Sequence, residues 1–219
     1  MDEKQQNLES KMCGRFYVDE DGDITPWIEE ANRKQMMLTG EMTVHAGEIL
    51  PSSAVAAVAR GKKEARGIFP MIWGYQSTGD KKLLINARSE TASARPLFRD
   101  SLRERRCLLP ADHYFEWEHP ENGKKVKYQI RPEMPGTVWL AALYRFMPDR
   151  ILPQCIILTR EPEEEIRFIH NRMPLIFNDE EAETWLRQDA DPEKLIRENH
   201  RKMKWMADAG TLISTPWVE

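Results

Sequence analysis

Cys13 is the residue of this sequence with the most distinctive potential chemistry. Met12 precedes it, and Gly14-Arg15-Phe16 follows it. If proteolysis makes Cys13 the first residue of the chain, it carries an α-amine with a pKa of about 7.7–8.0 beside a thiol with a pKa of about 8.5. Such an aminothiol can form an imine with an aldehyde and then close its thiol onto the imine as a thiazolidine. The alternative is that Cys13 is a small buried hydrophobe at the start of a strand.

Four segments contain polar residues of kinds that buried strands rarely hold without a function. They are residues 12–16 (MCGRF), 85–91 (INARSET), 106–117 (RCLLPADHYFEW) and 170–174 (HNRMP). In this order, and together with residues 69–75 (FPMIWGY), they resemble the SRAP family (SOS response-associated peptidase). The resemblance implies a sensor of abasic sites in single-stranded DNA, which shields the lesion through a covalent thiazolidine crosslink to Cys13. We expect no cofactor and no metal.

The resemblance assigns acid–base catalysis to Glu116, which lies between Phe115 and Trp117. An abasic deoxyribose is mostly a closed hemiacetal, so a proton-transfer group must help to open it to the aldehyde. An apolar environment raises the pKa of a carboxyl group and suits it to proton transfer near neutral pH. The alternative is a surface glutamate on a strand. Glu118 fits that alternative, yet alternation puts both glutamates on one face, so the sequence alone does not separate them.

His170 and Asn86 complete the catalytic set that the resemblance implies. A histidine can give or take a proton during imine formation, and Arg172 stands close enough in the sequence to grip the same nucleotide. The alternative for His170 is a helix-end residue bonded to a carbonyl group. Asn86 follows the apolar residues 83–85, and in the family it orients the sugar or the attacking cysteine. It could instead simply turn the chain at the end of a strand.

Three arginines inside the motifs, Arg15, Arg88 and Arg172, are candidates for binding phosphate. A guanidinium group can hold a phosphate with two hydrogen bonds, so three of them in one groove would form a positive track. The alternative is that each makes a surface salt bridge with a glutamate. The other candidates for DNA contact are neutral: Gly14, Ser89, Thr91, Thr159 and, as a ring that stacks on a base, Trp73. A core position is the alternative for Trp73.

The start of the chain departs from the family pattern, in which removal of methionine makes the cysteine the first residue. Here residues 1–12 precede Cys13. Three interpretations stay open: translation begins at Met12, self-proteolysis removes the extension, or the chain as given is inactive. Self-proteolysis assisted by Glu116 and His170 would account for the word peptidase in the family name. We expect residues 1–11 to be a disordered extension and residues 12–219 to form the domain.

Two other classes of function also remain open. A thiol peptidase that acts on proteins could pair Cys13 with His170, and it would not need a free α-amine. A non-covalent reader of modified cytosine in DNA would keep the arginines and Trp73, and it would survive the loss of Cys13. Replacement of Cys13 by serine separates both classes from the crosslinking hypothesis.

The composition is that of an ordinary soluble globular domain, with 41% hydrophobic and 31% charged residues in 219. The net charge of −4 argues against a histone-like binder of nucleic acid. Residues 1–11 lack the apolar run of a signal peptide, and residues 54–59 are too few to span a bilayer. Three cysteines without CxxC spacing favour a reducing compartment, with Cys107 and Cys155 as inert core residues. We expect a cytoplasmic monomer that associates with the nucleoid when DNA is damaged.

Short strands with helices between and after them must position these residues. Strands are predicted at residues 13–18, 54–60, 67–75, 83–87, 106–110, 114–118, 126–130, 138–146 and 154–159. Helices are predicted at residues 28–38, 163–169, 180–186 and 192–205. The Asn122-Gly123 pair predicts a hairpin between two of the strands. We therefore expect an α+β fold, a single domain with a curved or barrel-like, mostly antiparallel sheet and flanking helices.

Overall fold

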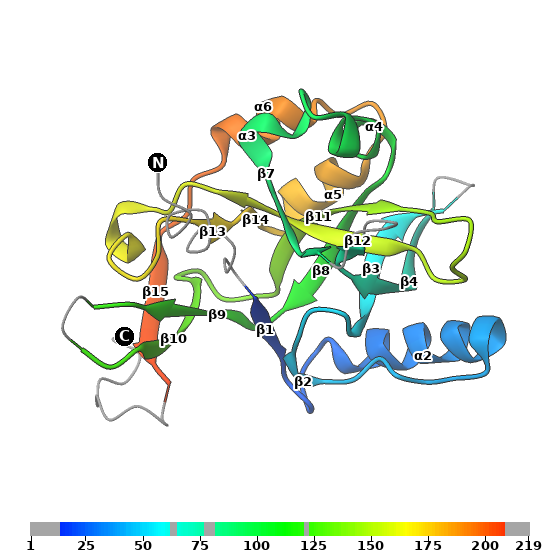
Figure 1. The fold of residues 1–219 in the computed structure, drawn as a ribbon, viewed down its shortest axis with the longest axis horizontal. Helices are drawn as coiled ribbons and strands as arrows, with labels where there is room; N and C mark the ends of the chain where they lie inside the picture. Colours follow the sequence, from blue (N-terminus) through cyan, green and yellow to red (C-terminus); the bar gives the residue numbers. More distant parts are fainter. Residues whose placement is uncertain (1–13, 62–64, 77–81, 121–122, 209–219) are drawn as a thin grey trace.

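A closed barrel of strands forms the centre of the fold (Figure 1). The structure is a computed structural model that describes residues 14–61, 65–76, 82–120 and 123–208. The barrel strands are β3 (Ala54–Arg60), β4 (Arg66–Trp73), β8 (Arg106–Ala111), β11 (Val138–Arg145) and β12 (Gln154–Arg160). They pair in the order β12-β4-β3-β8-β11, and β11 pairs back to β12, which closes the circuit. Within this circuit β12 and β4 are parallel and the other pairs are antiparallel, so the predicted α+β fold with a barrel-like sheet is confirmed.

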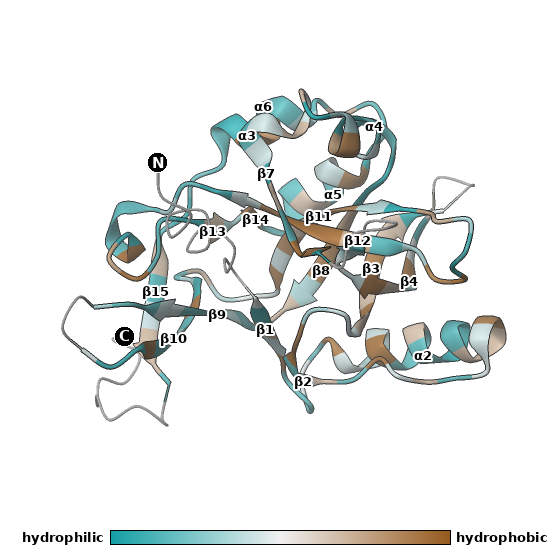
Figure 2. Cartoon of the chain, in the orientation of Figure 1, coloured by the Kyte–Doolittle hydropathy of each residue, from teal (hydrophilic) through white to brown (hydrophobic). Residues whose placement is uncertain are grey.

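The barrel strands are apolar on both faces because one face lines the interior and helices cover the other. β3 is buried at every position except its last. α2 (Thr25–Thr39) packs on β3 and β4, while α4 (Pro96–Glu104) and α5 (Asp179–Leu186) pack on β8 and β11. Figure 2 shows hydrophobic residues concentrated in the barrel strands, whereas α3 (Ser89–Ala92) and α6 (Pro192–Glu198) are mainly hydrophilic.

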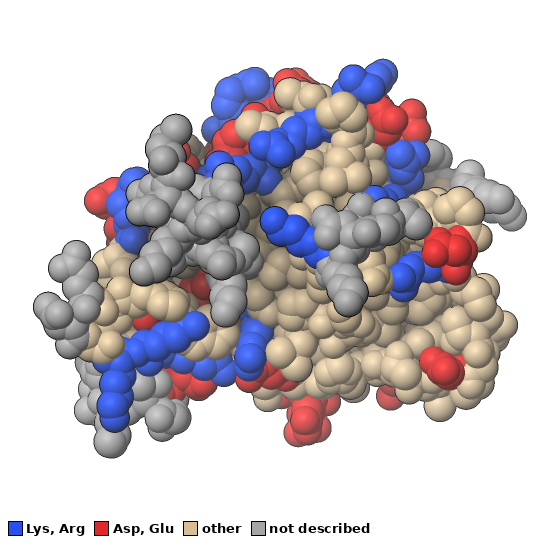
Figure 3. Space-filling view, in the orientation of Figure 1, with Lys and Arg blue, Asp and Glu red and all other residues tan. Residues whose placement is uncertain are grey.

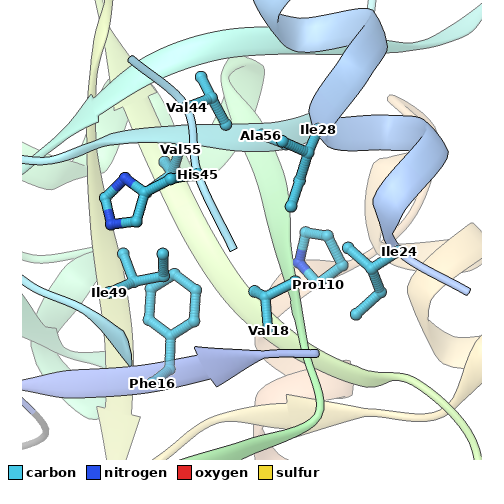
Figure 4. Close-up of a pocket in the computed structure, with 10 residues that line it drawn as sticks. All are labelled: Phe16, Val18, Ile24, Ile28, Val44, His45, Ile49, Val55, Ala56 and Pro110. Carbon is cyan, nitrogen blue, oxygen red and sulfur yellow. The ribbon is translucent and has the colours of Figure 1, made fainter. Parts of the chain in front are cut away.

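A second sheet, antiparallel throughout, lies beside the barrel and carries two of the motif segments. Its order is β15-β10-β9-β1-β2, from strands β1 (Arg15–Val18), β2 (Gly47–Ile49), β9 (His113–Glu118), β10 (Val126–Pro132) and β15 (Met203–Ala207). Phe16 and Val18 of β1 point toward Ile28 of α2 and Pro110 of β8 in an apolar layer between sheet and barrel (Figure 4). The void in this layer measures about 10 Å³, room for about one water, so the two sheets are firmly packed.

Short strands bring the other two motif segments to the end of β12. β7 (Asn86–Arg88) pairs with β12 in parallel, and β13 (Met173–Pro174) pairs with it in the antiparallel sense. β14 (Ile176–Phe177) then pairs with β11, while β5 (Tyr75–Gln76) and β6 (Leu83–Leu84) form a separate small ladder. The barrel therefore holds these motifs on a rigid scaffold.

Two of the predicted helices need correction. The helix predicted at residues 192–205 ends at Glu198, and Met203 begins strand β15 instead. β10 offers a free sheet edge there, and Trp205 packs against Phe168, so tertiary contacts override the local helical pattern. Residues 163–169 contain one 3₁₀ turn, η1 (Glu164–Ile166), rather than an α-helix. The sequence pattern also missed α4. None of the helices in the described ranges is long and apolar enough to cross a membrane.

Candidate functional site

The start of β1 brings together three of the four motif segments. Cys13 itself lies outside the described residues. Gly14 is the first described residue, and a Cβ added there would lie 3.9 Å from Cδ1 of Ile85. Arg15 then pairs with Phe115 of β9 across the second sheet. The chain that follows Cys13 therefore lies between β9 and the segment that leads into β7.

β12 brings the fourth motif segment to the same region. Asn86 is level with Ile157, and Arg88 is level with Thr159, in the parallel pairing of β7 with β12. On the other side of β12, Thr159 pairs with Pro174 of β13. Segments far apart in the sequence thus converge around one end of the barrel.

Glu116 is a deeply buried carboxyl group, with 2% of its surface exposed. It lies opposite Tyr128 of β10, and its Oε2 accepts a hydrogen bond from the backbone N–H of Trp117 at 3.4 Å. The Tyr128 ring meets Phe168 edge-on, with 5.8 Å between ring centroids, so the segment that leads to His170 covers this face of the sheet. The alternative of a surface glutamate is therefore wrong for Glu116.

Glu118 lies further along β9 and has a different partner. Its carboxylate accepts a hydrogen bond from the phenol of Tyr128 at 2.9 Å. Burial and this carboxylate together raise the pKa of Tyr128 to about 12. Glu118 is more exposed than Glu116, and its hydrogen bond ties it to the hairpin of β9 and β10. The structure thus separates two glutamates that the sequence left equivalent.

His170 is held in one orientation by its own chain. Its Nδ1 accepts a hydrogen bond from the backbone N–H of Arg172 at 3.1 Å. Burial lowers the pKa of His170 below its ordinary value of 6.5, and the positive charge of Arg172 acts in the same direction. The ring is therefore neutral near pH 7. Since Nδ1 accepts a hydrogen bond, the proton lies on Nε2, which makes Nε2–H the donor that His170 can offer to a ligand.

Arg172 is engaged by protein groups rather than free for phosphate. Its two terminal nitrogens donate to the carboxylate of Glu90 at 2.7 and 2.8 Å, and one of them also donates to the carbonyl of Thr159 at 2.6 Å. Burial acts to raise the pKa of Glu90, but the hydrogen bonds from Arg172 outweigh it, so the pKa of this carboxyl group is lowered. With 10% of its side chain exposed, Arg172 braces the loop of His170.

Arg15 lies on the outer face of the second sheet, beside an aromatic ring and two further cations. Its guanidinium group is 5.4 Å from the ring centre of Trp117 and donates to Glu48 at 2.6 Å. Lys125 and Lys127 also lie over Trp117, at 5.0 and 5.8 Å. Figure 3 shows Lys and Arg side chains over the region of β9 and β10. This face combines positive charge with a π-surface.

A groove of about 380 Å³ opens beside β7. Asn86, Arg88 and Thr91 line it, and Arg95 and Leu97 at the start of α4 form its other side. Arg88 is exposed, whereas Asn86 and Thr91 are half-buried. The groove therefore joins a predicted catalytic residue to predicted phosphate-binding residues.

Three predicted DNA contacts are not supported by the described structure. Trp73 is fully buried and donates from Nε1 to the carbonyl of Ile85 at 3.1 Å, so its ring has no face for a base. Thr159 is fully buried as well, and its hydroxyl reaches the carbonyl of Ala87 at 3.5 Å. The hydroxyl of Ser89 is also buried. Trp73 and Thr159 are buried positions of the barrel strands β4 and β12, and Ser89 is the buried first residue of α3.

The two cysteines that the structure describes, Cys107 and Cys155, are buried and unpaired, as predicted. Burial, with the nearby Cys155, raises the pKa of the Cys107 thiol well above its ordinary value. Within the described part of the chain no group of three or more His, Cys, Asp or Glu side chains is placed to hold a metal ion.

The sequence matches the family model described as SOS response associated peptidase (SRAP) over residues 12–209. The chain belongs to the SRAP family. Two similar SRAP relatives are abasic site processing proteins of Bacillus subtilis. YobE is 31% identical over 194 residues, which cover 84% of this chain and 86% of YobE. YoqW is 32% identical over 194 residues, which cover 84% of each chain.

A solved structure of a protein from Bacteroides thetaiotaomicron has the same fold as this SRAP chain. The two align with a TM-score of 0.70 over 89% of this chain and 91% of the other, at 18% sequence identity. At 18% identity this similarity shows a shared fold and nothing about function.

Sequence reasoning on this SRAP chain missed the surroundings of Trp117. The tryptophan was noted only as a neighbour of Glu116, and neither lysine was singled out. The signal was available, because alternation on a hairpin places Trp117 level with Lys127. Arg95 was missed because α4 was not predicted.

Proposed function

We propose that this protein recognises abasic sites in single-stranded DNA and captures them covalently through Cys13 as the first residue of the mature chain. The names of relatives that are 31% and 32% identical, abasic site processing proteins, support this class of substrate. The observation that carries the proposal is the burial of Glu116 at the strand next to the one that follows Cys13. A buried carboxyl group beside an N-terminal aminothiol is the pair that aldehyde capture needs.

The chemistry proceeds in two bond-forming steps. Glu116 takes the hydroxyl proton of the closed sugar and returns a proton to the ring oxygen, so that the sugar opens to its aldehyde. The α-amine of Cys13 then adds to C1′, and loss of one water gives the imine. The thiol adds to the imine carbon and its proton passes to the nitrogen, which closes the thiazolidine. No oxidant, reductant or metal enters this balance.

The remaining polar residues orient the nucleotide in this scheme. The neutral His170 donates from Nε2 to an oxygen of the opening sugar, and Asn86 orients the sugar or the cysteine. Arg15 and Arg88 bind the flanking phosphates, with Gly14 and Thr91 close to the backbone of the DNA. Arg172 orients His170, since its backbone N–H donates to Nδ1 of His170 while its side chain is fixed by Glu90.

Exposure of the α-amine requires cleavage after Met12. We assign this step to the same groups, with Glu116 and His170 assisting attack on the peptide bond before Cys13, which agrees with the peptidase description of the family. A DNA substrate implies action in the cytoplasm at the nucleoid, and we expect the protein to act as a monomer.

Covalent capture is tested by mixing the mature protein with a single-stranded oligonucleotide that contains one abasic site. A denaturing gel should show a crosslinked band without borohydride, because a thiazolidine resists hydrolysis whereas a simple imine does not. Cys13→Ser should give no stable band and should retain DNA binding. A band that requires borohydride would rule out ring closure. Peptidase activity on other proteins without any crosslink would favour the thiol peptidase instead.

A further inference from the structure

We propose that a stripe of arginines on α4, formed by Arg95, Arg99 and Arg103, binds the phosphate backbone of single-stranded DNA that leaves the site. This inference rests on the proposed function and deepens it, since it gives the protein a second contact with the strand beyond the lesion. The stripe is defined by these three residues and excludes Arg88, which belongs to the site itself.

The spacing of the stripe follows from helix geometry. Residues four apart lie almost above one another on an α-helix, as Arg99 and Arg103 do on α4, and Arg95 precedes them by four residues as the N-cap of the helix. All three are exposed, while Phe98, Ser101 and Leu102 form the buried face of α4. At about 1.5 Å per residue the stripe is about 12 Å long. One strand of duplex DNA presents a phosphate about every 3.4 Å of helix axis, so a single strand, which can be more extended, places at most about three phosphates along this length.

The charge of the stripe is available to a ligand. Among the described residues, Arg95 and Arg103 have no carboxylate partner within salt-bridge distance, and Arg99 reaches only Asp100, at 3.5 Å. Asp100 and Glu104 each follow an arginine by one residue, which places them about 100° further around the helix. Positive and negative side chains are thus segregated on α4. Figure 3 shows Lys and Arg side chains over the region where α3 and α4 lie.

Continuity with the proposed site favours DNA over another polyanion. Arg95 lines the same groove as Asn86 and Arg88, and Leu97 offers an exposed apolar side chain there, 44% exposed. A second groove, beside the first, is lined by Arg99 and Arg103. A strand held at Asn86 is therefore led directly onto α4.

The second groove also sets the path of the strand. Its other wall carries Asp191 and Glu193 of α6. The Asp191 carboxylate is engaged in capping α6, where it accepts from the backbone N–H groups of Glu193 and Lys194. These carboxylates repel an anion in the depth of the groove, so the phosphates are expected along the α4 rim. Bases would then face away from the acidic wall.

The test measures non-covalent binding to oligonucleotides that carry a tetrahydrofuran analogue of the abasic site. This analogue has no aldehyde, so the result does not depend on crosslinking, and failure of the capture chemistry would leave it interpretable. A short oligonucleotide has three nucleotides on each side of the analogue. Two longer ones add eight nucleotides to either the 5′ or the 3′ side. The variant is Arg99→Gln/Arg103→Gln, which leaves Arg95 in the groove beside Asn86 unchanged, and the charge-matched control is Arg33→Gln/Arg187→Gln, at exposed sites elsewhere.

For the wild type and the control, we expect one of the two extensions to raise affinity and to steepen the log–log salt slope by up to about 2, since each phosphate on a single strand contributes about 0.7. The α4 variant should lose most of this gain and keep its affinity for the short oligonucleotide within about twofold. The proposal is overturned if neither extension raises wild-type affinity, or if the variant gains as the wild type does. Equal losses for short and long oligonucleotides also overturn it, as does competition by polyglutamate at the same charge concentration as DNA. Urea midpoints check the fold, and if the double variant is unstable the single variant Arg99→Gln is used, for which a partial loss of the gain is expected.

Discussion

Replacement of Glu116 by glutamine tests the acid–base assignment most sharply. Glutamine has the same shape, and its side-chain oxygen can still accept the hydrogen bond from the backbone N–H of Trp117. It cannot, however, take up or release a proton. Because Glu116 is 2% exposed, no bulk water is at hand to replace it as a proton carrier.

The expected loss is in rate rather than in affinity. General acid–base catalysis by one group contributes about 10²–10⁴ in rate, so crosslinking by Glu116→Gln should be slower by about that factor. Binding to DNA that carries the tetrahydrofuran analogue should change by less than about threefold. The rate is measured with excess mature protein over abasic oligonucleotide, quenched at timed intervals and resolved on a denaturing gel.

Glu118→Gln is the matched control, on the same face of the same strand. Its side-chain oxygen can still accept from the phenol of Tyr128, so the hairpin should be unchanged. We expect a crosslinking rate within about threefold of the wild type. Abolition of crosslinking by Glu118→Gln, with a normal rate for Glu116→Gln, would refute the assignment and the proton-transfer scheme built on it.

Three further predictions follow from particular contacts. Burial, with help from Arg131, lowers the pKa of His113 to about 4. The unfolded state, with an ordinary pKa near 6.5, therefore takes up more protons as the pH falls, and stability should drop by about 2 kcal/mol by pH 5. The variant His113→Phe keeps the ring stack on Tyr17, and its unfolding free energy, measured with urea, should fall less between pH 7 and pH 5 than that of the wild type. An equal fall in both proteins would show that His113 does not cause this pH dependence. Arg106 is buried and donates to the carbonyls of Leu102, Arg103, Trp185 and Arg187, where α4 and α5 end. Arg106→Met should cost about 2–4 kcal/mol of unfolding free energy, and a loss below about 1 kcal/mol would show that these carbonyls find other donors. Arg172 is held by both oxygens of Glu90 and has only 10% of its side chain exposed, whereas Arg15, though paired with Glu48, has 41% exposed. The short oligonucleotide should therefore bind with a log–log salt slope of about −1.4, from Arg15 and Arg88, and a slope of about −2 would mean that Arg172 also releases its partner to bind phosphate.

The strands of the barrel were readable from the sequence because they are apolar and bounded by turn residues. β3 was predicted with the bounds that it has, and the strands of the hairpin flanking Asn122-Gly123 pair as predicted, although residues 121–122 lie outside the described residues. The end of the predicted helix at residues 192–205 was not readable, since Met203–Ala207 follow a helical segment but form a strand on the free edge of β10. Pairing between strands distant in sequence leaves no local pattern.

The catalytic candidates were readable by type, but their roles depended on partners that only the fold brings together. The sequence could not tell that Glu90 occupies Arg172, or that Trp73 faces the core while Trp117 lies among cations. Each of these distinctions depends on which face of a strand is covered, and that is decided by tertiary packing.

Mass spectrometry of the digested crosslink tests the central claim most directly. The mature protein is allowed to react with an abasic oligonucleotide without reductant, treated with iodoacetamide and digested with trypsin. We expect the sugar to be attached to the peptide Cys13-Gly14-Arg15. The mass of the adduct should equal that of the peptide plus that of the abasic oligonucleotide minus one water, and the thiol of Cys13 should be protected from alkylation. A sugar attached to a lysine, or to Cys13 with its thiol alkylated, would contradict capture as a thiazolidine.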